Sequence, residues 1–268
     1  MRSIKFGIMQ GRLTKTRNNI LQKFPKNWQE EFKYLKKTKL DYIEFFTEKK
    51  INKKNPFWSN KSLNDIKKNI SKIKFKKIIL CDNYTVENLI IEKKTEQYLI
   101  NLIDRLSFFK GSKLIIPIVS KKLFLEKIFN KHIILISRLI NHSKNKKVNL
   151  SFEIDANIKI IKKFCKKFSN NKLFAITYDT GNAFLFNKNF YTEVNSIKNA
   201  INHIHLKDRD FLGNNVVLGQ GKIKFDLFFK NLNTPKNYNG TITFETNRGN
   251  DPISTANSNY TIIRNLLS

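Results

Sequence analysis

The 268-residue sequence contains only two cysteines and no apolar run of about 18 residues. Cys81 and Cys165 lie far apart and form no CxxC pair, which argues against a disulfide framework and a thiolate zinc site. We expect both to be buried thiols. The N-terminus lacks an apolar segment ending in a small-residue cleavage site. We therefore expect a cytoplasmic protein without a membrane partner.

Acidic residues are also scarce, since 21 Asp and Glu face 51 Lys and Arg and leave a formal net charge of +30. A polyanion such as nucleic acid could bind a protein of this charge. However, the 43 lysines are scattered through nearly every segment of helical spacing, and Asn, Ile and Phe, which share A+T-rich codons with Lys, are abundant. We interpret most of the charge as compositional bias and expect no specific nucleic-acid binding.

The chain has no Gly-, Ser- or Pro-rich linker, and its length suits one (β/α)8 barrel, which needs about 250 residues. Short apolar runs alternate with longer amphipathic stretches, as in a parallel α/β fold. The predicted strands are Ile4–Met9, Tyr42–Phe46, Lys77–Cys81, Leu114–Val119, Val148–Glu153, Phe174–Tyr178, His203–Leu206 and Thr241–Phe244. The predicted helices are Trp28–Lys39, Ser62–Lys72, Thr95–Lys110, Leu123–His142, Ile158–Phe168, Glu193–Ala200, Phe225–Leu232 and Ser254–Leu267. We predict a single-domain TIM barrel over residues 1–268.

Four motifs in the second half place a candidate metal ligand where an apolar strand stops. They are SFEID, ITYDTGN, HIHLKD and TFET, which contain Glu153, Asp179, His205 and Glu245. Four consecutive strands would deliver these side chains to one end of the barrel. Three carboxylates and an imidazole suit Mn²⁺, Mg²⁺, Co²⁺ or Zn²⁺ and would leave positions for substrate oxygens. Without a cation the carboxylates would raise one another's pKa, so we predict one divalent ion.

Together with GIMQGRL, DYIEFF and VVLGQGKIKF, these motifs resemble the xylose isomerase-like barrel superfamily of sugar phosphate isomerases and epimerases. The subgroup that they resemble is often found among bacterial surface-polysaccharide genes. The resemblance implies the same four ligands and a metal-dependent isomerase or epimerase of carbohydrate metabolism. It also implies proton transfer next to a metal-bound carbonyl, with Glu153 and Glu245 as the acid/base pair. Asn182 departs from the pattern, because many members have a histidine there and an amide cannot shuttle a proton.

Several other side chains are expected at the same end of the barrel. Lys207 shares a strand face with His205 and is expected to contact substrate. The same is expected of Asn182, Arg12, Glu44 and Arg248. We further expect Asp208 to orient a ligand, His203 to be a packed barrel residue, and His132 and His142 to be surface residues.

Other functions stay open at this point. A lyase similar to inosose dehydratase would use a similar metal site and the same proton abstraction, and would then expel a hydroxyl group. An endonuclease IV-like DNA-repair enzyme needs several zinc ions and extra histidines, but the sequence has four histidines and none ends the second or third strand. A non-catalytic barrel is disfavoured because all four ligand positions remain competent. The sugar or cyclitol substrate, the metal and the assembly, monomer or homo-oligomer, are not determined by the sequence.

Overall fold

A computed structural model describes residues 4–14, 24–119, 127–186, 189–234 and 238–267. Parallel strands form a closed barrel in the order β1-β10-β7-β6-β5-β4-β3-β2. Their bounds are β1 Lys5–Met9, β2 Tyr42–Phe46, β3 Ile79–Cys81, β4 Lys113–Val119, β5 Asn149–Asp155, β6 Ile176–Asp179, β7 Ile201–Leu206 and β10 Thr241–Phe244. Each coincides with or overlaps a predicted strand, and the predicted (β/α)8 TIM barrel is confirmed. A separate antiparallel hairpin, β8 Asp208–Arg209 with β9 Asn215–Val216, follows β7.

The helices alternate with the strands along the chain. They are α1 Glu30–Leu35, α2 Asn60–Ile70, α3 Tyr84–Glu87, α4 Lys93–Leu106, α6 Phe129–Lys146, α7 Ile158–Lys167, α8 Thr180–Phe186, α9 Phe190–Glu193, α10 Phe225–Leu232 and α11 Pro252–Leu266. Short 3-10 turns cover Pro56–Trp58, Val194–Ser196 and Lys198–Ala200. Among the described residues, no helix is both long enough and apolar enough to span a bilayer.

Most of the predicted helices overlap an observed one, with one error. Glu193–Ala200 is not a helix but the end of α9 followed by two 3-10 turns. Two asparagines and a serine in this segment compete with helical hydrogen bonds, which favours turns. Residues 123–126 of the predicted helix Leu123–His142 lie outside the described residues, and its remainder lies within α6 apart from a short lead-in.

The residues of the barrel group into two compact units. The first unit comprises Met1–Glu44, Ile73–Phe75 and Thr177–Ser268, and the second comprises Phe45–Lys72 and Lys76–Ile176.

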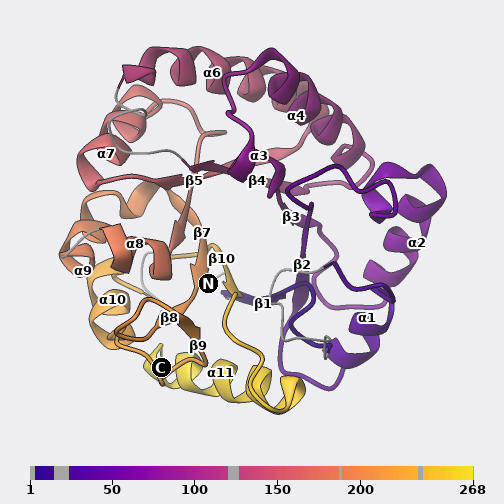
Figure 1. Ribbon diagram of the computed structural model, residues 1–268, viewed down its shortest axis with the longest axis vertical. Coiled ribbons are helices and arrows are strands. Elements are labelled where there is room, and N and C mark those ends of the chain that lie inside the picture. Colours follow the sequence, from indigo (N-terminus) through magenta and orange to yellow (C-terminus); the bar gives the residue numbers. More distant parts are fainter. Residues whose placement is uncertain (1–3, 15–23, 120–126, 187–188, 235–237, 268) are drawn as a thin grey trace. The chain divides into compact units, whose positions relative to one another are not determined.

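In the first unit, the N-terminal and C-terminal strands lie side by side. Figure 1 shows β1, in indigo, next to β10, and the register pairs Gly7 with Thr243. A Cβ atom on Gly7 would lie 2.1 Å from the ring of Tyr42, so glycine makes room for this aromatic side chain. The Tyr42 hydroxyl then forms a 2.9 Å hydrogen bond with Thr243 Oγ1. The absence of a side chain at Gly7 therefore leaves room for the Tyr42 ring and for the hydrogen bond between its hydroxyl group and Thr243.

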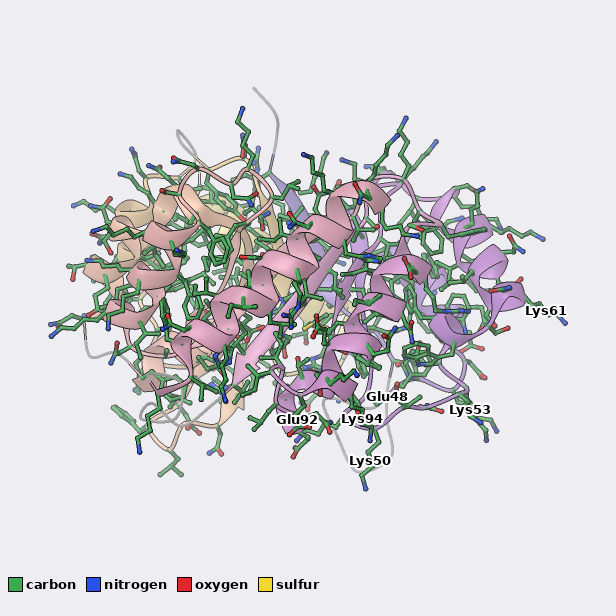
Figure 2. All side chains as sticks on the ribbon, turned by 90° about the horizontal axis from the view of Figure 1, so that it is seen from above. Glu48, Lys50, Lys53, Lys61, Glu92 and Lys94 are labelled. Atoms are coloured by element: carbon green, nitrogen blue, oxygen red, sulfur yellow. The ribbon has the colours of Figure 1, made fainter. Side chains whose placement is uncertain are left out.

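In the second unit, α4 and α6 pack against each other and bury apolar stripes. Leu99, Leu102 and Leu106 of α4 are completely buried, which is the spacing of one helical face. Lys93 and Lys94 of α4 and Lys131 and Lys144 of α6 are exposed. Elsewhere in this unit, Figure 2 shows the side chains of Lys50 and Lys61 pointing away from the ribbon. Most of the described lysines of this unit are thus exposed to solvent.

Two expectations about burial need correction. Cys81 is buried as expected, whereas Cys165 is partly exposed. His132 is 2 % exposed and therefore not a surface residue, because its face of α6 packs against Phe164 of α7. His142 is half-buried and forms a 2.9 Å contact with Asp104.

Candidate metal centre

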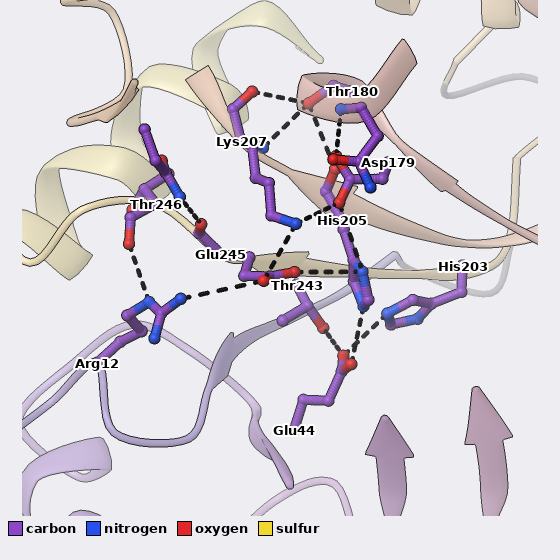
Figure 3. Close-up of polar contacts among 12 residues, drawn as sticks. Arg12, Glu44, Asp179, Thr180, His203, His205, Lys207, Thr243, Glu245 and Thr246 are labelled. Carbon is purple, nitrogen blue, oxygen red and sulfur yellow. Dashed lines mark hydrogen bonds and ion pairs between the residues drawn. The ribbon is translucent and has the colours of Figure 1, made fainter. Parts of the chain in front are cut away.

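Three of the four expected ligands lie together in the first unit. Asp179 is the last residue of β6, His205 lies in β7, and Glu245 follows β10 directly. His205 Nδ1 is 3.3 Å from Glu245 Oε2 and 3.9 Å from Asp179 Oδ2 (Figure 3). The three residues are at most 5 % exposed. Strands that end at one side of the barrel therefore bring two carboxylates and one imidazole nitrogen to a common point.

This donor set fits a divalent metal ion. Oxygen and imidazole ligands suit Mg²⁺, Mn²⁺, Co²⁺ and Zn²⁺. Burial by itself would raise the pKa of Asp179, but the charges of Lys207 and His205 outweigh burial and lower this pKa. Asp179 is thus held as a carboxylate, the form that binds a cation.

Lys207 lies between two of these carboxylates. Its Nζ is 2.6 Å from Asp179 Oδ2 and 3.1 Å from Glu245 Oε1, and its side chain is 11 % exposed. Figure 3 shows the ammonium group pointing toward both acids. The lysine expected to contact substrate therefore neutralises charge within the cluster.

On the other side of His205, a buried carboxylate connects two imidazole rings. Glu44 Oε1 is 2.8 Å from His205 Nε2, and Glu44 Oε2 is 2.9 Å from His203 Nε2. All three side chains are fully buried. Glu44 Oε2 also accepts a hydrogen bond from the hydroxyl of Thr243, and His203 Nδ1 is 2.6 Å from Thr241 Oγ1. With Nε2 facing Glu44, the His205 ring presents Nδ1 to Asp179 and Glu245.

The pKa of Glu44 reflects these partners. Burial would raise it, but the charges and hydrogen bonds of His205 and His203 lower it well below its ordinary value. His203 is packed, as expected, and its contact with Glu44 was not foreseen.

Helix α8 begins directly after Asp179 and ties β6 to β7. Asp179 Oδ1 accepts a 2.9 Å hydrogen bond from the backbone N–H of Asn182. The Thr180 hydroxyl donates to the carbonyl of Lys207 at 2.8 Å. Asn182 Oδ1 accepts a 3.5 Å hydrogen bond from Arg209. Asn182 therefore lies at the same end of the barrel as the candidate ligands.

Two buried arginines connect the loops after β1 and β10. Arg12 Nη2 is 4.0 Å from Glu245 Oε1, and its Nε donates to the carbonyl of Thr246 at 3.0 Å. Arg248 Nε donates to the carbonyl of Gly11 at 2.7 Å. Burial lowers the pKa of Arg12 to about 10, which keeps this group charged near neutral pH. Arg12 and Arg248, which were expected to contact substrate, thus connect these two loops by hydrogen bonds beside Glu245.

Glu31 is a buried residue of this region that the sequence reasoning missed. Its Oε1 accepts a 2.7 Å hydrogen bond from the backbone N–H of Gly11. Burial raises the pKa of Glu31 to about 8, against the lowering effect of backbone hydrogen bonds from Gly11 and Leu13 and of the charges of Arg12 and Arg248. The sequence feature that could have identified Glu31 is its position among the apolar residues of the predicted helix Trp28–Lys39.

Asp208 does not orient a ligand, which corrects the expectation. Its carboxylate accepts backbone hydrogen bonds of 2.8, 2.9 and 3.2 Å from Gly219, Gly221 and Ile223. The strand β7 ends at Leu206, and Asp208 starts the hairpin β8–β9. Its side chain therefore organises the loop that follows the hairpin.

Glu153, the fourth expected ligand, belongs to the second unit. It is 7 % exposed and pairs in register with Pro117, near the carboxyl end of β5. The registers Phe46 with Cys81, Cys81 with Ile115, and Ile115 with Ser151 define one face of this part of the sheet. Glu153 shares that face because it follows Ser151 by two residues. By the same alternation, Glu44 shares it with Phe46.

The fold and the site together place this protein in a class: parallel (β/α)8 barrels that carry carboxylates and an imidazole at their strand ends as a candidate metal centre. The chain belongs to the family described as "Xylose isomerase-like TIM barrel", whose model matches residues 32–265. None of the curated protein sequences matches the chain.

Solved structures share the fold at low sequence identity. The D-allulose 3-epimerase from Methylomonas sp. has a TM-score of 0.75 and 16 % identity, with 100 % of this chain and 99 % of that chain covered. An L-ribulose 3-epimerase has a TM-score of 0.77 and 14 % identity, with 99 % and 95 % covered. The IolI protein with a bound zinc atom has a TM-score of 0.70 and 14 % identity, with 99 % of each chain covered.

Proposed function

We propose that the protein is a divalent-metal-dependent sugar isomerase or epimerase that moves a proton at a carbon next to a carbonyl group. The observation that carries this proposal is the convergence of Asp179, His205 and Glu245 at the carboxyl ends of barrel strands. Two structural neighbours are named as epimerases of sugars, which supports this reaction class.

The metal would be held by Asp179, His205, Glu245 and Glu153. Glu153 is included because β5 follows β6 in the strand order and Glu153 lies on the face that Glu44 shares. The neighbour with a bound zinc atom supports a metal in this fold, and we keep Mn²⁺, Mg²⁺, Co²⁺ and Zn²⁺ as candidates. A bound divalent ion would polarise the substrate carbonyl and stabilise the negative charge that develops on its oxygen.

The protein side chains supply proton transfer and orientation. We assign Glu153 and Glu245 as the acid/base pair, and a positioned carboxylate of this kind contributes roughly 10²- to 10⁴-fold in rate. Asn182, Arg12, Arg248 and Lys207 lie where they could hydrogen-bond hydroxyl or anionic groups of a sugar or cyclitol. For Glu44 we replace the expected substrate contact by a positioning role, because its contacts hold His205 and His203. The proposal includes a cytoplasmic role in carbohydrate metabolism, such as supplying sugars for surface polysaccharides, without nucleic acid or membrane as a partner.

The experiment is exchange of substrate protons with solvent deuterium. The metal-loaded protein is incubated in D₂O with a panel of ketoses, aldoses and cyclitols, free and phosphorylated, and deuterium incorporation is followed by NMR. We expect exchange at one carbon of the accepted substrate. Glu153→Gln and Glu245→Gln should lose exchange by more than they lose metal occupancy, whereas Glu30→Gln, an exposed residue of α1, should not change it.

Three outcomes would alter the proposal. Full exchange in both metal-loaded variants would leave these residues as ligands only. Exchange accompanied by elimination of water would replace the isomerase by the lyase similar to inosose dehydratase. Cleavage of abasic DNA at physiological salt would instead indicate an endonuclease IV-like activity.

A further inference from the structure

The position of Lys207 is built by three consecutive residues of the strand-six motif. Asp179 contacts its ammonium group at 2.6 Å, and Thr180 exchanges hydrogen bonds of 2.8 and 3.0 Å with its backbone carbonyl and N–H. Gly181 makes room for its stem, because a Cβ atom there would lie 2.6 Å from Lys207 Cβ and 3.2 Å from its Cδ. The DTG segment thus holds the backbone, the stem and the charge of this lysine.

The two carboxylates that face Lys207 use their oxygens differently. Asp179 Oδ1 accepts the N–H of Asn182, so Oδ2 is the oxygen that faces both Lys207 Nζ and His205 Nδ1. Glu245 divides its contacts, with Oε1 toward Lys207 and Oε2 toward His205. A cation held by His205 would therefore share Glu245 with Lys207 through different oxygens, but would compete with Lys207 for one oxygen of Asp179.

We propose that Lys207 is a built-in counter-ion of the metal centre, which neutralises Asp179 and Glu245 and sets how tightly the divalent ion binds. The inference rests on the proposed metal site. It goes beyond that site because it gives Lys207 a role in metal affinity and in the stability of the metal-free protein, independent of substrate. For the metal ion to bind, the ammonium group of Lys207 must give up its contact with Asp179 Oδ2.

Electrostatics gives the direction of each effect. A positive charge a few ångströms from a bound cation opposes its binding by several-fold to many-fold in a partly buried site. The same charge stabilises buried carboxylates when the metal is removed, because they would otherwise repel each other. Loss of the ammonium should therefore tighten metal binding and destabilise the metal-free protein, two effects of opposite sign.

The test compares Lys207→Met with Lys230→Met, which makes the same chemical change at an exposed lysine in the last turn of α10. Calorimetric titration with Mn²⁺ and with Zn²⁺ measures affinity, and thermal melts with chelator measure the metal-free protein. We expect Lys207→Met to bind metal at least about tenfold more tightly and to melt at a lower temperature when chelated. Lys230→Met should match the wild type in both measurements, which excludes a general effect of net charge.

A double-mutant cycle covers the case in which chelated Lys207→Met is poorly folded. Asp179→Asn removes the charge that Lys207 faces, so it should restore part of the chelated stability that Lys207→Met loses. The same cycle with Lys230→Met should show no coupling. Affinity of Lys207→Met equal to or weaker than wild type, or absence of coupling, would overturn the role of Lys207. If the wild type itself bound no ion and His205→Ala behaved identically, the metal site would fail instead.

Discussion

Two fully buried carboxyl groups, Glu44 within strand β2 and Asp82 directly after β3, differ in their partners and therefore in the direction in which their pKa is shifted. Glu44, in β2 of the first unit, faces the imidazoles of His203 and His205. Asp82, after β3 in the second unit, accepts hydrogen bonds from the hydroxyls of Thr47 and Tyr98 at 2.6 and 2.8 Å. Burial raises the pKa of both, but only Glu44 has partners that reverse the effect.

This difference shows that burial of an acid in or directly after a barrel strand does not by itself mark a functional site. Asp82 also accepts the backbone N–H of Thr85 at 3.0 Å, which organises the start of α3. Its role is local and structural. Glu44 instead joins two histidines on another strand, one of which points its second nitrogen at Asp179 and Glu245. The two histidine partners therefore distinguish Glu44, which belongs with the candidate metal centre, from Asp82, which has a structural role.

Among the variants that test this comparison, Glu44→Ala is expected to have the largest effect. Removing the carboxylate leaves two buried imidazoles without their shared anion, which should cost about 3–5 kcal/mol in the free energy of unfolding. Metal affinity should fall about 10- to 100-fold because His205 loses the group that orients it. Urea unfolding and calorimetric titration measure the two effects. Asp82→Ala should lower stability alone, and equal metal affinity in both variants would contradict the distinction.

The comparison is sharpened by pH, because the two acids should contribute with opposite signs. Glu44 has a lowered pKa, so its contribution is present above the ordinary Glu value and is lost as pH falls below it. Asp82 has a raised pKa, so its contribution is present at low pH and is lost as pH rises above the ordinary Asp value. Urea midpoints are measured with chelator between about pH 2.5 and 8. Glu44→Gln should lose a rise of stability with pH that the wild type shows below about pH 4.5, whereas Asp82→Asn should lose a fall of stability with pH above about pH 3.8. Changes of the same sign would refute the assignment.

The smallest effect is expected at Glu31, a third buried acid whose arginine neighbours only partly oppose burial. Its pKa of about 8 means that the folded protein holds a proton that the unfolded chain releases near pH 4.5. Stability should therefore fall as pH rises from about 5 to 8, by at most a few kcal/mol. Glu31→Gln keeps an oxygen for the N–H of Gly11 and should flatten this slope in thermal melts. Parallel pH profiles for the variant and the wild type would count against the buried proton.

The fold could be predicted from the sequence because each βα repeat carries its own apolar run and amphipathic stretch. The positions of Asp179, His205 and Glu245 followed from the rule that parallel strands end at one side of a barrel. Their partners could not be predicted, since the contact between His205 and Glu44 joins residues separated by 161 positions. The place of Glu44 on the second predicted strand suggested that it faces the pocket, but did not distinguish a substrate contact from a buried pair with histidine.

Two further differences between the sequence-based expectations and the structure have local causes. Asp208 was expected to orient a ligand, but β7 ends before it and a hairpin turns its carboxylate toward the backbone of residues 219–223. Lys207 keeps the inward face, and its ion pairs with Asp179 and Glu245 depend on the space above Gly181, which no sequence pattern reports.

The most direct test of the metal centre is the metal content of the purified protein after loading with Mn²⁺, Mg²⁺, Co²⁺ or Zn²⁺ and removal of free ions. Mass spectrometry of metals should find about one divalent ion per chain in the wild type, as a single site of this donor set requires. His205→Ala should lose most of it, while His142→Ala, which changes a half-buried histidine paired with Asp104, should retain it. Stoichiometric metal in His205→Ala, or no metal in the wild type with any of the four ions, would contradict the account.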